Sequence, residues 1–518
     1  MKPSRSRADL LPIVILLLVQ FALRAHHPLA MAAFWDENSH ITRAHDLYHL
    51  TGSPVAASHG KLLLYFWLGL FQPDPAQGAL AVSRLAIALF SLVGSAGIVA
   101  AARALFGRRA MVPALAFYAL APYAVFFERM AFADPFAGAL AALVAWQSVV
   151  LARRPTRARG ALVGLLIALT GLAKLTTAIV GGLPLLAIVL FGGEPWRDWR
   201  ALAAGAVALA APWIVVLGIA LVQVVGQGQE IILLDTYLIG DNTRAGGVFA
   251  RLENTFILKT GLLLGHPMTL LLAGLAALLL WKRTRPALYV LAWLGAIWLP
   301  ITLVATELQS RYLMAGVPAL AVIFGGGMAT AGTWIAGRAG RSRLAAPVTG
   351  TLAGAALAAW ALLFALPFVR TATTDPGRLE MPRQDVTNYF SGLFTTWGTR
   401  AAFDDLQASG QRAGGMVPVV GVLRVCEVHT LFLPDDIAWD CMPSHAFPDQ
   451  IVPRDTATWT VLHTSVARWP FVYLLTDYLP PDAAPQGSPD LAWEFAGSYP
   501  RPHDGTPVTV WRVTVRRS

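Results

Sequence analysis

Two adjacent carboxylates, Asp36 and Glu37, stand shortly after the first long apolar run of the chain. An acidic pair in such a place can supply a catalytic base and a metal ligand. The same residues can also start a helix over residues 37–50, with Asp36 as its N-cap and Glu37 stabilised by the helix dipole. Spacing alone favours the helix start, so both interpretations stay open.

Of the two carboxylates, Asp36 is predicted to be the base. Phe34 and Trp35 precede it and can bury that end of the loop against a membrane, and burial beside apolar rings raises the pKa of a carboxylate. We expect the helix to begin near Asn38, so that the two acidic side chains diverge. Glu37 would then hold a divalent metal ion together with His59.

Five basic residues at the ends of apolar runs form a second candidate group. A charge inside the hydrocarbon costs free energy unless it is partnered, so such residues are functional candidates. Because they arise from different spans at one membrane depth, they can surround one anion, and a diphosphate or phosphodiester headgroup is the anion that a membrane offers there. The five are Lys61, Arg84, Arg129, Lys174 and Arg311.

These cations also have structural explanations. Lys61 begins an aromatic run, ending at Trp67, that is too short to span a membrane and is expected in its interface. There Lys61 can meet a lipid phosphate or simply extend its amine toward water. Arg129 and Asp134 can pair with each other and hold a turn. The supporting candidates around the cations are Asp134, Tyr65 and Tyr312.

These residues need a membrane-spanning scaffold to position them. Of the 518 residues, 56% are hydrophobic and only 14% are charged, which excludes an ordinary soluble protein. The apolar runs are long and do not alternate with polar residues, so they predict helices rather than barrel strands. Eleven spans are expected, over residues 10–26, 76–102, 110–127, 134–152, 160–173, 176–192, 201–221, 261–281, 286–304, 312–336 and 344–368.

The loop charges predict the orientation. With the N-terminus in the cytoplasm, 18 of the 28 basic residues in the first 368 fall in inner segments, as the positive-inside rule requires. This assignment depends on a break at Lys174 between two short helices, because one continuous helix would reverse everything after it. The first run also fits a secretory signal cleaved near residues 30–32, but Arg24 interrupts the approach to that site, and we expect the run to be retained as a span.

Two domains are expected. A membrane domain covers residues 1–368, with outside loops at 27–75 and 222–260, and an extracytoplasmic α/β domain covers residues 369–518. The net charge of +10 belongs to the membrane part, which argues against a nucleic-acid partner, since the tail holds 12 basic and 16 acidic residues.

The tail sequence predicts a small α/β domain with one disulfide. Cys426 and Cys441 are the only cysteines and both lie in the tail. An oxidising compartment permits them to pair, with two unpaired thiols as the alternative. Beta-rich runs are expected at 416–423, 471–475 and 508–515, and a helix at 397–409.

The order of the motifs resembles that of the lipid-dependent glycosyltransferases of the GT-C fold. It is most similar to glycosyltransferase family 39, which includes protein O-mannosyltransferases and lipid A aminoarabinose transferases. The resemblance covers residues 10–335, and more faintly residues 388–406. Each motif alone is weak, but seven in the same order and on the same side are specific. They are Asp36-Glu37, Gly60-Lys61 with Tyr65 and Trp67, Arg84-Leu85, Arg103 to Arg109, Arg129-x4-Asp134, Gly171 to Lys174, and Arg311-Tyr312-Leu313.

The resemblance implies an integral membrane enzyme of the inner or plasma membrane. It would be a hexosyl- or pentosyltransferase that moves a sugar, with inversion, from a polyprenyl-phosphate donor to an extracytoplasmic lipid, glycan or protein. The first-loop acid would act as base toward the acceptor, and Lys61 with nearby arginines would hold the donor phosphate. No nucleotide cofactor is expected, because the lipid phosphate is already a good leaving group. The family has a carboxylate before its lysine where this chain has His59, so a bound metal would need His59 in place of an oxygen ligand.

Two other functional classes are alternatives. A secondary transporter would carry charges near mid-span on broken helices, with repeat symmetry between its halves. Here the candidate charges lie toward the outer face, and no repeat is evident. A non-catalytic cell-envelope assembly protein with the same fold is the other alternative.

Overall fold

The computed structural model describes residues 10–71, 74, 78–193, 199–227, 247–305, 308–338, 340, 345–413, 415–443, 456–477 and 490–516. It divides into two compact units. Unit 1 comprises Met1–Pro28, Arg43–Pro73 and Val82–Thr374, and unit 2 comprises Leu29–Thr42, Asp74–Ala81 and Asp375–Ser518. The last boundary lies six residues after the domain end predicted at residue 368, and two segments of the first predicted outside loop belong to unit 2.

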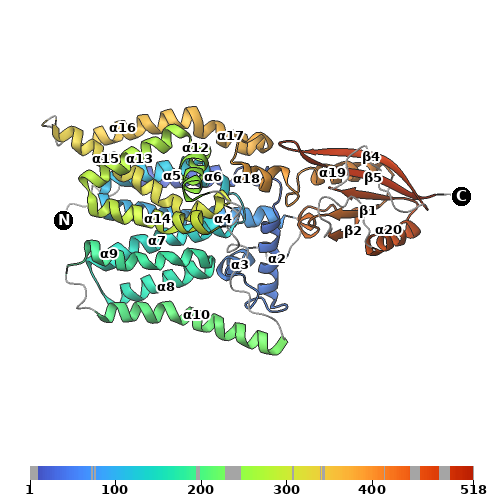
Figure 1. Cartoon of the computed structure of the whole chain (residues 1–518), viewed down its shortest axis with the longest axis horizontal. Helices are drawn as coiled ribbons and strands as arrows, with labels where there is room; N and C mark the ends of the chain where they lie inside the picture. Colours follow the sequence, from blue (N-terminus) through green and yellow to red (C-terminus); the bar gives the residue numbers. More distant parts are fainter. Residues whose placement is uncertain are drawn as a thin grey trace. The chain divides into compact units, whose positions relative to one another are not determined.

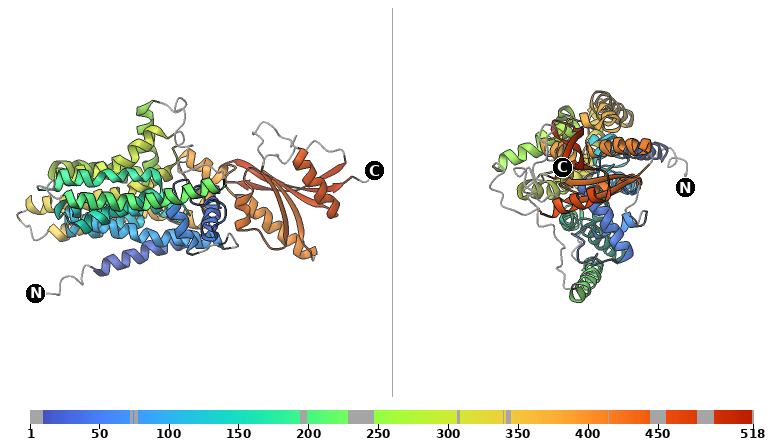
Figure 2. Two further views of the ribbon diagram at one scale, coloured as in Figure 1. Left: turned by 90° about the horizontal axis from the view of Figure 1, so that it is seen from below. Right: turned by 90° about the vertical axis from the view of Figure 1, so that its right-hand side faces the viewer.

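Unit 1 is a bundle of helices, most of which run roughly parallel in Figures 1 and 2. Its first half contains α1 (Leu10–Ala25), the end of α2 (Trp35–His49), α3 (Leu62–Gly69), α4 (Ala79–Phe106), α5 (Met111–Leu120), α6 (Pro122–Phe127), α7 (Ala133–Arg153), α8 (Arg157–Ala173) and α9 (Leu183–Phe191). Its second half contains α10 (Trp199–Gln227), α11 (Val248–Glu253), α12 (Thr260–Leu264), α13 (His266–Lys282), α14 (Thr284–Val304), α15 (Val317–Arg338), α16 (Ala345–Trp360) and α17 (Leu366–Thr374). Short 3₁₀ or π segments join several of them: η1 (Arg108–Ala110), η2 (Leu175–Gly182), η6 (Asn254–Lys259), η7 (Ser310–Gly316) and η9 (Ala361–Ala365).

Each of the eleven predicted apolar runs contains a helix of the structure. Within the described residues, six helices are long and apolar enough to cross a membrane, and shorter apolar helices at Leu10–Ala25, Leu175–Phe191 and His266–Lys282 accompany them. The chain is therefore a helical polytopic membrane protein. Of the predicted outside loop at 222–260, residues 228–246 lie outside the described residues, as do the inner segments 1–9, 194–198 and 341–344.

Helix α15 forms the centre of unit 1, because its apolar stretch is buried on all sides. Three successive glycines allow this close packing. A Cβ on Gly325 would lie 2.4 Å from the carbonyl oxygen of Ala110, and one on Gly327 would lie 2.6 Å from the Cβ of Leu275. Small residues let neighbouring backbones approach where lipid provides no hydrophobic drive for helix association.

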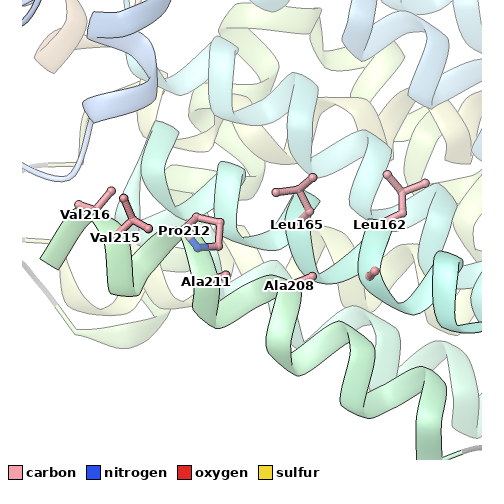
Figure 3. Close-up of a pocket in the computed structure, with 8 residues that line it drawn as sticks. Leu162, Leu165, Ala208, Ala211, Pro212, Val215 and Val216 are labelled. Atoms are coloured by element: carbon pink, nitrogen blue, oxygen red, sulfur yellow. The ribbon is translucent and has the colours of Figure 1, made fainter. Parts of the chain in front are cut away.

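Helices α8 and α10 pack through a second set of small residues. A Cβ on Gly160 or Gly164 would lie only 1.9 Å from the carbonyl oxygen of Ala201 or Gly205, respectively. Beside this contact, a shallow apolar groove runs between the two helices (Figure 3), and its lining includes Leu162, Leu165, Pro212 and Val215.

The predicted break at Lys174 is present. Helix α8 ends at Ala173, Lys174 adopts an extended backbone (φ −161°, ψ 114°), and a 3₁₀ segment begins at Leu175. The extended residue turns the chain away from the axis of α8. The two short helices expected on either side of Lys174 are α8 and η2–α9.

The α/β part of unit 2 is a five-stranded mixed sheet in the order β2-β1-β3-β5-β4. Strand β1 pairs in parallel with β2 and β3, whereas β5 pairs antiparallel with β3 and β4. The last two strands form the long hairpin seen in Figure 2. The strands are β1 (Val417–Leu423), β2 (Ile437–Pro443), β3 (Val472–Thr476), β4 (Leu491–Arg501) and β5 (Gly505–Val515). The remaining elements of unit 2 are η10 (Pro376–Arg378), α18 (Arg383–Val386), η11 (Thr387–Ser391), α19 (Thr399–Ala413), η12 (Glu427–Leu431) and α20 (Thr456–Arg468).

The sheet has a helix on each face. Phe403 of α19 is buried against one set of strand residues that includes Val419, and Leu462 of α20 is buried against another set that includes Val420. Neighbouring strand residues point to opposite faces, so the two helices cover opposite sides. Cys426 and Cys441 form a disulfide with their Cα atoms 5.7 Å apart.

The start of α2 is held within unit 2 by the segment before α19. The Trp35 N–H donates to the Phe394 carbonyl at 3.0 Å, and the Thr396 N–H donates to the Ala33 carbonyl at 3.1 Å. Ala33 returns a bond from its own N–H to the Thr396 hydroxyl at 3.0 Å. This short antiparallel contact fixes the residues immediately before Asp36.

Candidate active site

Lys174 is the centre of a buried polar group in unit 1. Its amine pairs with the Asp134 carboxylate at the start of α7, and both side chains are at most one-tenth exposed. The same amine lies 4.6 Å from the centroid of the Tyr312 ring. Burial lowers the pKa of Lys174, Asp134 opposes this, and the positive charges of Arg311 and Lys61 lower the pKa further. Those two cations are therefore close enough to act on Lys174.

Lys61 reaches this group through the turn that precedes α3. His59 and Gly60 adopt left-handed backbone conformations, with φ of 48° and 68°, a region in which glycine is favoured. The Gly60 carbonyl then accepts a hydrogen bond from the Leu175 N–H at 3.1 Å. The main chain thus ties Lys61 to the residue after Lys174.

Arg311 enters from η7, and its side chain is buried. Its guanidinium carbon lies 4.8 Å from the centroid of the Phe132 ring and 5.2 Å from that of Tyr312. Aromatic faces attract such cations through their quadrupoles. Tyr312 is thus shared by Arg311 and Lys174, so the predicted supporting residue joins two cations.

Tyr65 of α3 lies inside the bundle. It is buried in an apolar cluster that includes Phe136 of α7 and Ala173 of α8. The cluster anchors α3 against the two helices that provide Asp134 and Lys174. Lys61, Lys174 and Arg311, with Asp134 and Tyr312, form what we call the cation cluster.

Arg84 and Arg129 form a second buried group that is held by main-chain carbonyls. Arg84 donates to the Pro28 carbonyl at 2.7 Å. Arg129 donates to the carbonyls of His26 and His27 at 2.9 and 2.8 Å and to that of Ala372 at 3.0 Å. Burial lowers the pKa of Arg129 to about 10, and the charge of Arg84 contributes.

The structure excludes the alternative in which Arg129 pairs with Asp134. Although the two residues are five apart in the chain, Asp134 is paired with Lys174, and Arg129 holds the chain after α1 and the end of α17. Asp134 begins the first turn of α7, whereas Arg129 precedes that helix, so the short separation in sequence does not bring their side chains together.

The acidic pair belongs to the unit 2 end of α2. This helix begins at Trp35, not near Asn38 as predicted, so both carboxylates lie in its first turn. Glu37 is fully buried, and its carboxylate accepts the Phe34 N–H at 3.1 Å. Glu37, not Asp36, therefore provides the helix cap. Asp36 is half-buried, Phe34 is buried, and Trp35 is exposed, so only one of the two expected rings is covered.

One oxygen of the fully buried Glu37 carboxylate caps the helix, and the role of Glu37 as a metal ligand together with His59 stays a prediction. We therefore derive no step through a metal ion.

One buried polar network near the first span was not predicted from the sequence. Arg24 pairs with Glu128, and Tyr118 donates to the other oxygen of that carboxylate at 2.5 Å. Gln20 is bonded to Ser91 and Ser95 of α4. The sequence does place a charge near the end of each of two apolar runs, Arg24 and Glu128, and such charges pair when the runs pack together.

Comparison with known proteins identifies the fold. No protein-family model matches the chain, and no curated protein sequence matches it. The structure is similar to that of ArnT from Cupriavidus metallidurans bound to undecaprenyl phosphate, with 16% sequence identity, 98% of both chains covered and a TM-score of 0.58. The apo state of the same ArnT gives 15% identity, 97% coverage of both chains and a TM-score of 0.60. The chain therefore has the GT-C fold that ArnT has, and this is the fold that its motif order predicts.

Proposed function

We propose that this protein is a membrane glycosyltransferase that moves a hexosyl or pentosyl group from a polyprenyl-phosphate donor to an extracytoplasmic acceptor. The fold supports this proposal, because the similar ArnT structure covers nearly the whole chain and carries undecaprenyl phosphate. Fold likeness alone does not assign a reaction, so the proposal depends on the residues of this chain.

The cation cluster is the observation that carries the proposal. Lys61, Lys174 and Arg311 come from three separate segments, and the positive charges of the other two act on Lys174. Bringing like charges together in a buried place costs free energy, which a bound anion can offset. A donor phosphate supplies such an anion, and Arg and Lys side chains are its usual protein ligands.

The chemistry follows from the donor. The bond between the anomeric carbon and the phosphate oxygen breaks, and its electron pair leaves with the lipid phosphate. A hydroxyl or amine of the acceptor forms the new bond on the opposite face of the sugar, which inverts the anomeric configuration. The reaction needs a base for the proton that the acceptor loses, for which Asp36 of unit 2 is the candidate, and cations for the departing phosphate, for which the cation cluster of unit 1 is the candidate.

Binding of undecaprenyl phosphate to the purified chain in nanodiscs tests the donor site. Lys61→Gln and Arg311→Gln should each weaken binding about tenfold, because a charged hydrogen bond contributes about 1.5–3 kcal/mol. Arg153→Gln is the matched control, since Arg153 is exposed and donates to the Ala104 carbonyl at the far end of α7. Unchanged affinity in both cluster variants would reject the donor site.

Transfer is tested separately. The chain is incubated with radiolabelled polyprenyl-phosphate sugars and membrane extract, and the labelled product is identified. Label on a lipid, glycan or protein identifies the acceptor class, and no label with any tested donor, despite donor binding, would favour a non-catalytic protein of the same fold.

A further inference from the structure

Two exposed aromatic rings lie beside the candidate base in unit 2. Trp35 and Phe394 are 40% and 37% exposed, and their ring centroids are 6.0 Å apart with the planes inclined by 45°. Their positions are fixed by the hydrogen bond from the Trp35 N–H to the Phe394 carbonyl. Trp35 directly precedes Asp36. The two rings together offer an apolar surface on which a ligand can pack.

A cation flanks the same rings. The Arg424 guanidinium carbon lies 5.8 Å from the centroid of the Phe394 ring. Arg424 is the first residue after β1, and the loop that follows is anchored when Val425 and Val428 pack against Ala33 and Ile41. Arg424 and the start of α2 are therefore parts of one packed surface within unit 2.

The sheet topology places Arg424 where ligands bind in α/β domains. Strands β1 and β3 are adjacent and parallel, the chain leaves β1 toward β2 on one side, and it returns to β3 on the other side. Ligands of open α/β sheets bind outside the carboxyl ends of the strands at such a switch point. Arg424 follows β1 at that point, and Asp477 follows β3.

Asp477 is a buried residue directly after β3. It is 2% exposed, and one of its oxygens accepts from Arg501 at 3.1 Å. Its Oδ1 has no hydrogen-bond partner in the described part of the chain. Asp477 and Arg501 thus hold the carboxyl end of β3 and the end of β4 together.

We propose that Trp35, Phe394 and Arg424 form an acceptor subsite that binds a pyranose bearing an anionic group. This inference rests on the proposed glycosyltransferase function. The two rings offer an apolar surface to the C–H face of the sugar, and Arg424 pairs with a phosphate or carboxylate on it. Trp35 directly precedes the proposed base Asp36 in the first turn of α2, so the subsite lies on the same segment as that base.

Saturation-transfer NMR on the full chain in nanodiscs tests the subsite with two soluble probes. Glucose 6-phosphate carries the anion, and methyl β-glucoside does not. Trp35→Leu and Phe394→Leu should each weaken binding of both probes. Arg424→Gln should weaken binding of glucose 6-phosphate about tenfold and leave binding of the neutral probe unchanged, because only the first probe carries an anion for the guanidinium.

Two matched controls come from the same sheet. Phe495→Leu removes a ring that is 43% exposed and contacts Trp511. Arg512→Gln removes a guanidinium that lies 4.5 Å from the Phe471 ring centroid. Both should bind the probes like the wild type. Trp35→Tyr keeps an aromatic ring and should retain binding, which separates loss of the ring from a folding defect.

Three outcomes would overturn the subsite. The first is unchanged probe binding in Trp35→Leu, Phe394→Leu and Arg424→Gln, and the second is an equal loss of binding in the two control variants. The third is displacement of glucose 6-phosphate by an equal concentration of inorganic phosphate, because this would show a site for any anion. Undecaprenyl phosphate binding in the same samples reports on the cation cluster. Normal donor binding with any of these outcomes rejects the subsite and leaves the proposed function, whereas failed donor binding alone rejects the donor site.

Discussion

At the scale of single residues, Asp36 and Glu37 are neighbours in the chain with different surroundings. The first turn of α2 buries Glu37 and directs its carboxylate to the Phe34 N–H, whereas Asp36 stays half-buried. A helix turns by 100° per residue, so adjacent side chains cannot share one environment. Glu37 therefore takes the capping role, and the catalytic role of Asp36 stays a prediction.

Asp36→Asn should reduce turnover about 100-fold or more, because a general base contributes at least that much to the rate. Its affinity for undecaprenyl phosphate should stay close to the wild-type value, since cations of unit 1 are proposed to hold the donor. Glu37→Gln should instead lower the midpoint of thermal unfolding, because loss of a cap costs about 0.5–2 kcal/mol. Near wild-type transfer by purified Asp36→Asn would remove the base assignment.

Asp477 predicts a dependence of stability on pH in unit 2. Burial raises the pKa of Asp477 to about 6, although the Arg501 charge and the hydrogen bonds to the carboxylate oppose the rise. The folded state therefore keeps this proton to a higher pH than the unfolded chain does. The group contributes about 3 kcal/mol of stability below about pH 4, and this contribution is lost as the pH rises through 6.

Hydrogen exchange of β3 and β5 peptides between pH 4 and 7 measures this effect in the full chain. After correction for the intrinsic exchange rate, protection in the wild type should fall as the pH rises. Asp477→Asn cannot titrate, so its protection should change less over the same range. If protection changed equally with pH in the wild type and in Asp477→Asn, another titrating group would be responsible for the pH dependence.

At the scale of elements, the sequence predicts the three interior strands of the sheet but not its two edge strands. The order β2-β1-β3-β5-β4 puts β2 and β4 at the edges, and these are the two strands that were missed. Edge strands are exposed and carry polar residues, as in Glu494 and Ser498 of β4, so they lack a continuous apolar pattern. The interior strands β1 and β3 are buried, and their apolar runs are evident in the sequence.

The contact between α8 and α10 depends on glycine at residue 164. An alanine there would place its Cβ 1.9 Å from the Gly205 carbonyl oxygen, so the two backbones would have to separate. Gly164→Ala should therefore destabilise the purified protein by about 1–3 kcal/mol, the usual cost of overpacking, as measured by thermal unfolding in detergent.

Gly218→Ala is the control for this contact. A Cβ on Gly218 of α10 meets no atom within 4 Å, so alanine should be tolerated and should gain up to about 1 kcal/mol from its higher helix propensity. Equal stability of the two variants would show that the close approach of α8 and α10 is not needed.

At the scale of the whole molecule, the orientation stays a prediction that depends on an odd number of crossings. The N-terminal segment and the inner loops are basic, and the break at Lys174 adds one crossing to the count. A reporter fused after Ser518 should be active only outside the cytoplasm. The matched fusion after Lys282, in a predicted inner loop, should show the opposite pattern, and cytoplasmic activity of the first fusion would reject the topology.

The disulfide tests the same orientation by chemistry. Mass spectrometry of unreduced peptides from native membranes should recover Cys426 linked to Cys441. Replacing both by serine should destabilise unit 2 by about 3 kcal/mol, the value expected in the chain-entropy model for a loop of about 15 residues. Recovery of both as free thiols would place unit 2 in a reducing compartment.

The amino-acid sequence predicts the helical membrane fold, the interior strands of the tail and the basic residues of the cation cluster, although it groups these with Arg84 and Arg129, which form a separate group in the structure. These depend on local properties, since the length of an apolar run and the place of a charge within it are read along the chain. Only the tertiary structure decided that Asp134 pairs with Lys174 and not with Arg129, and that Phe394 and Arg424 lie near Trp35. Side-chain partners are chosen by how helices and loops pack across long sequence separations, and a buried charge takes whichever partner that packing brings within reach.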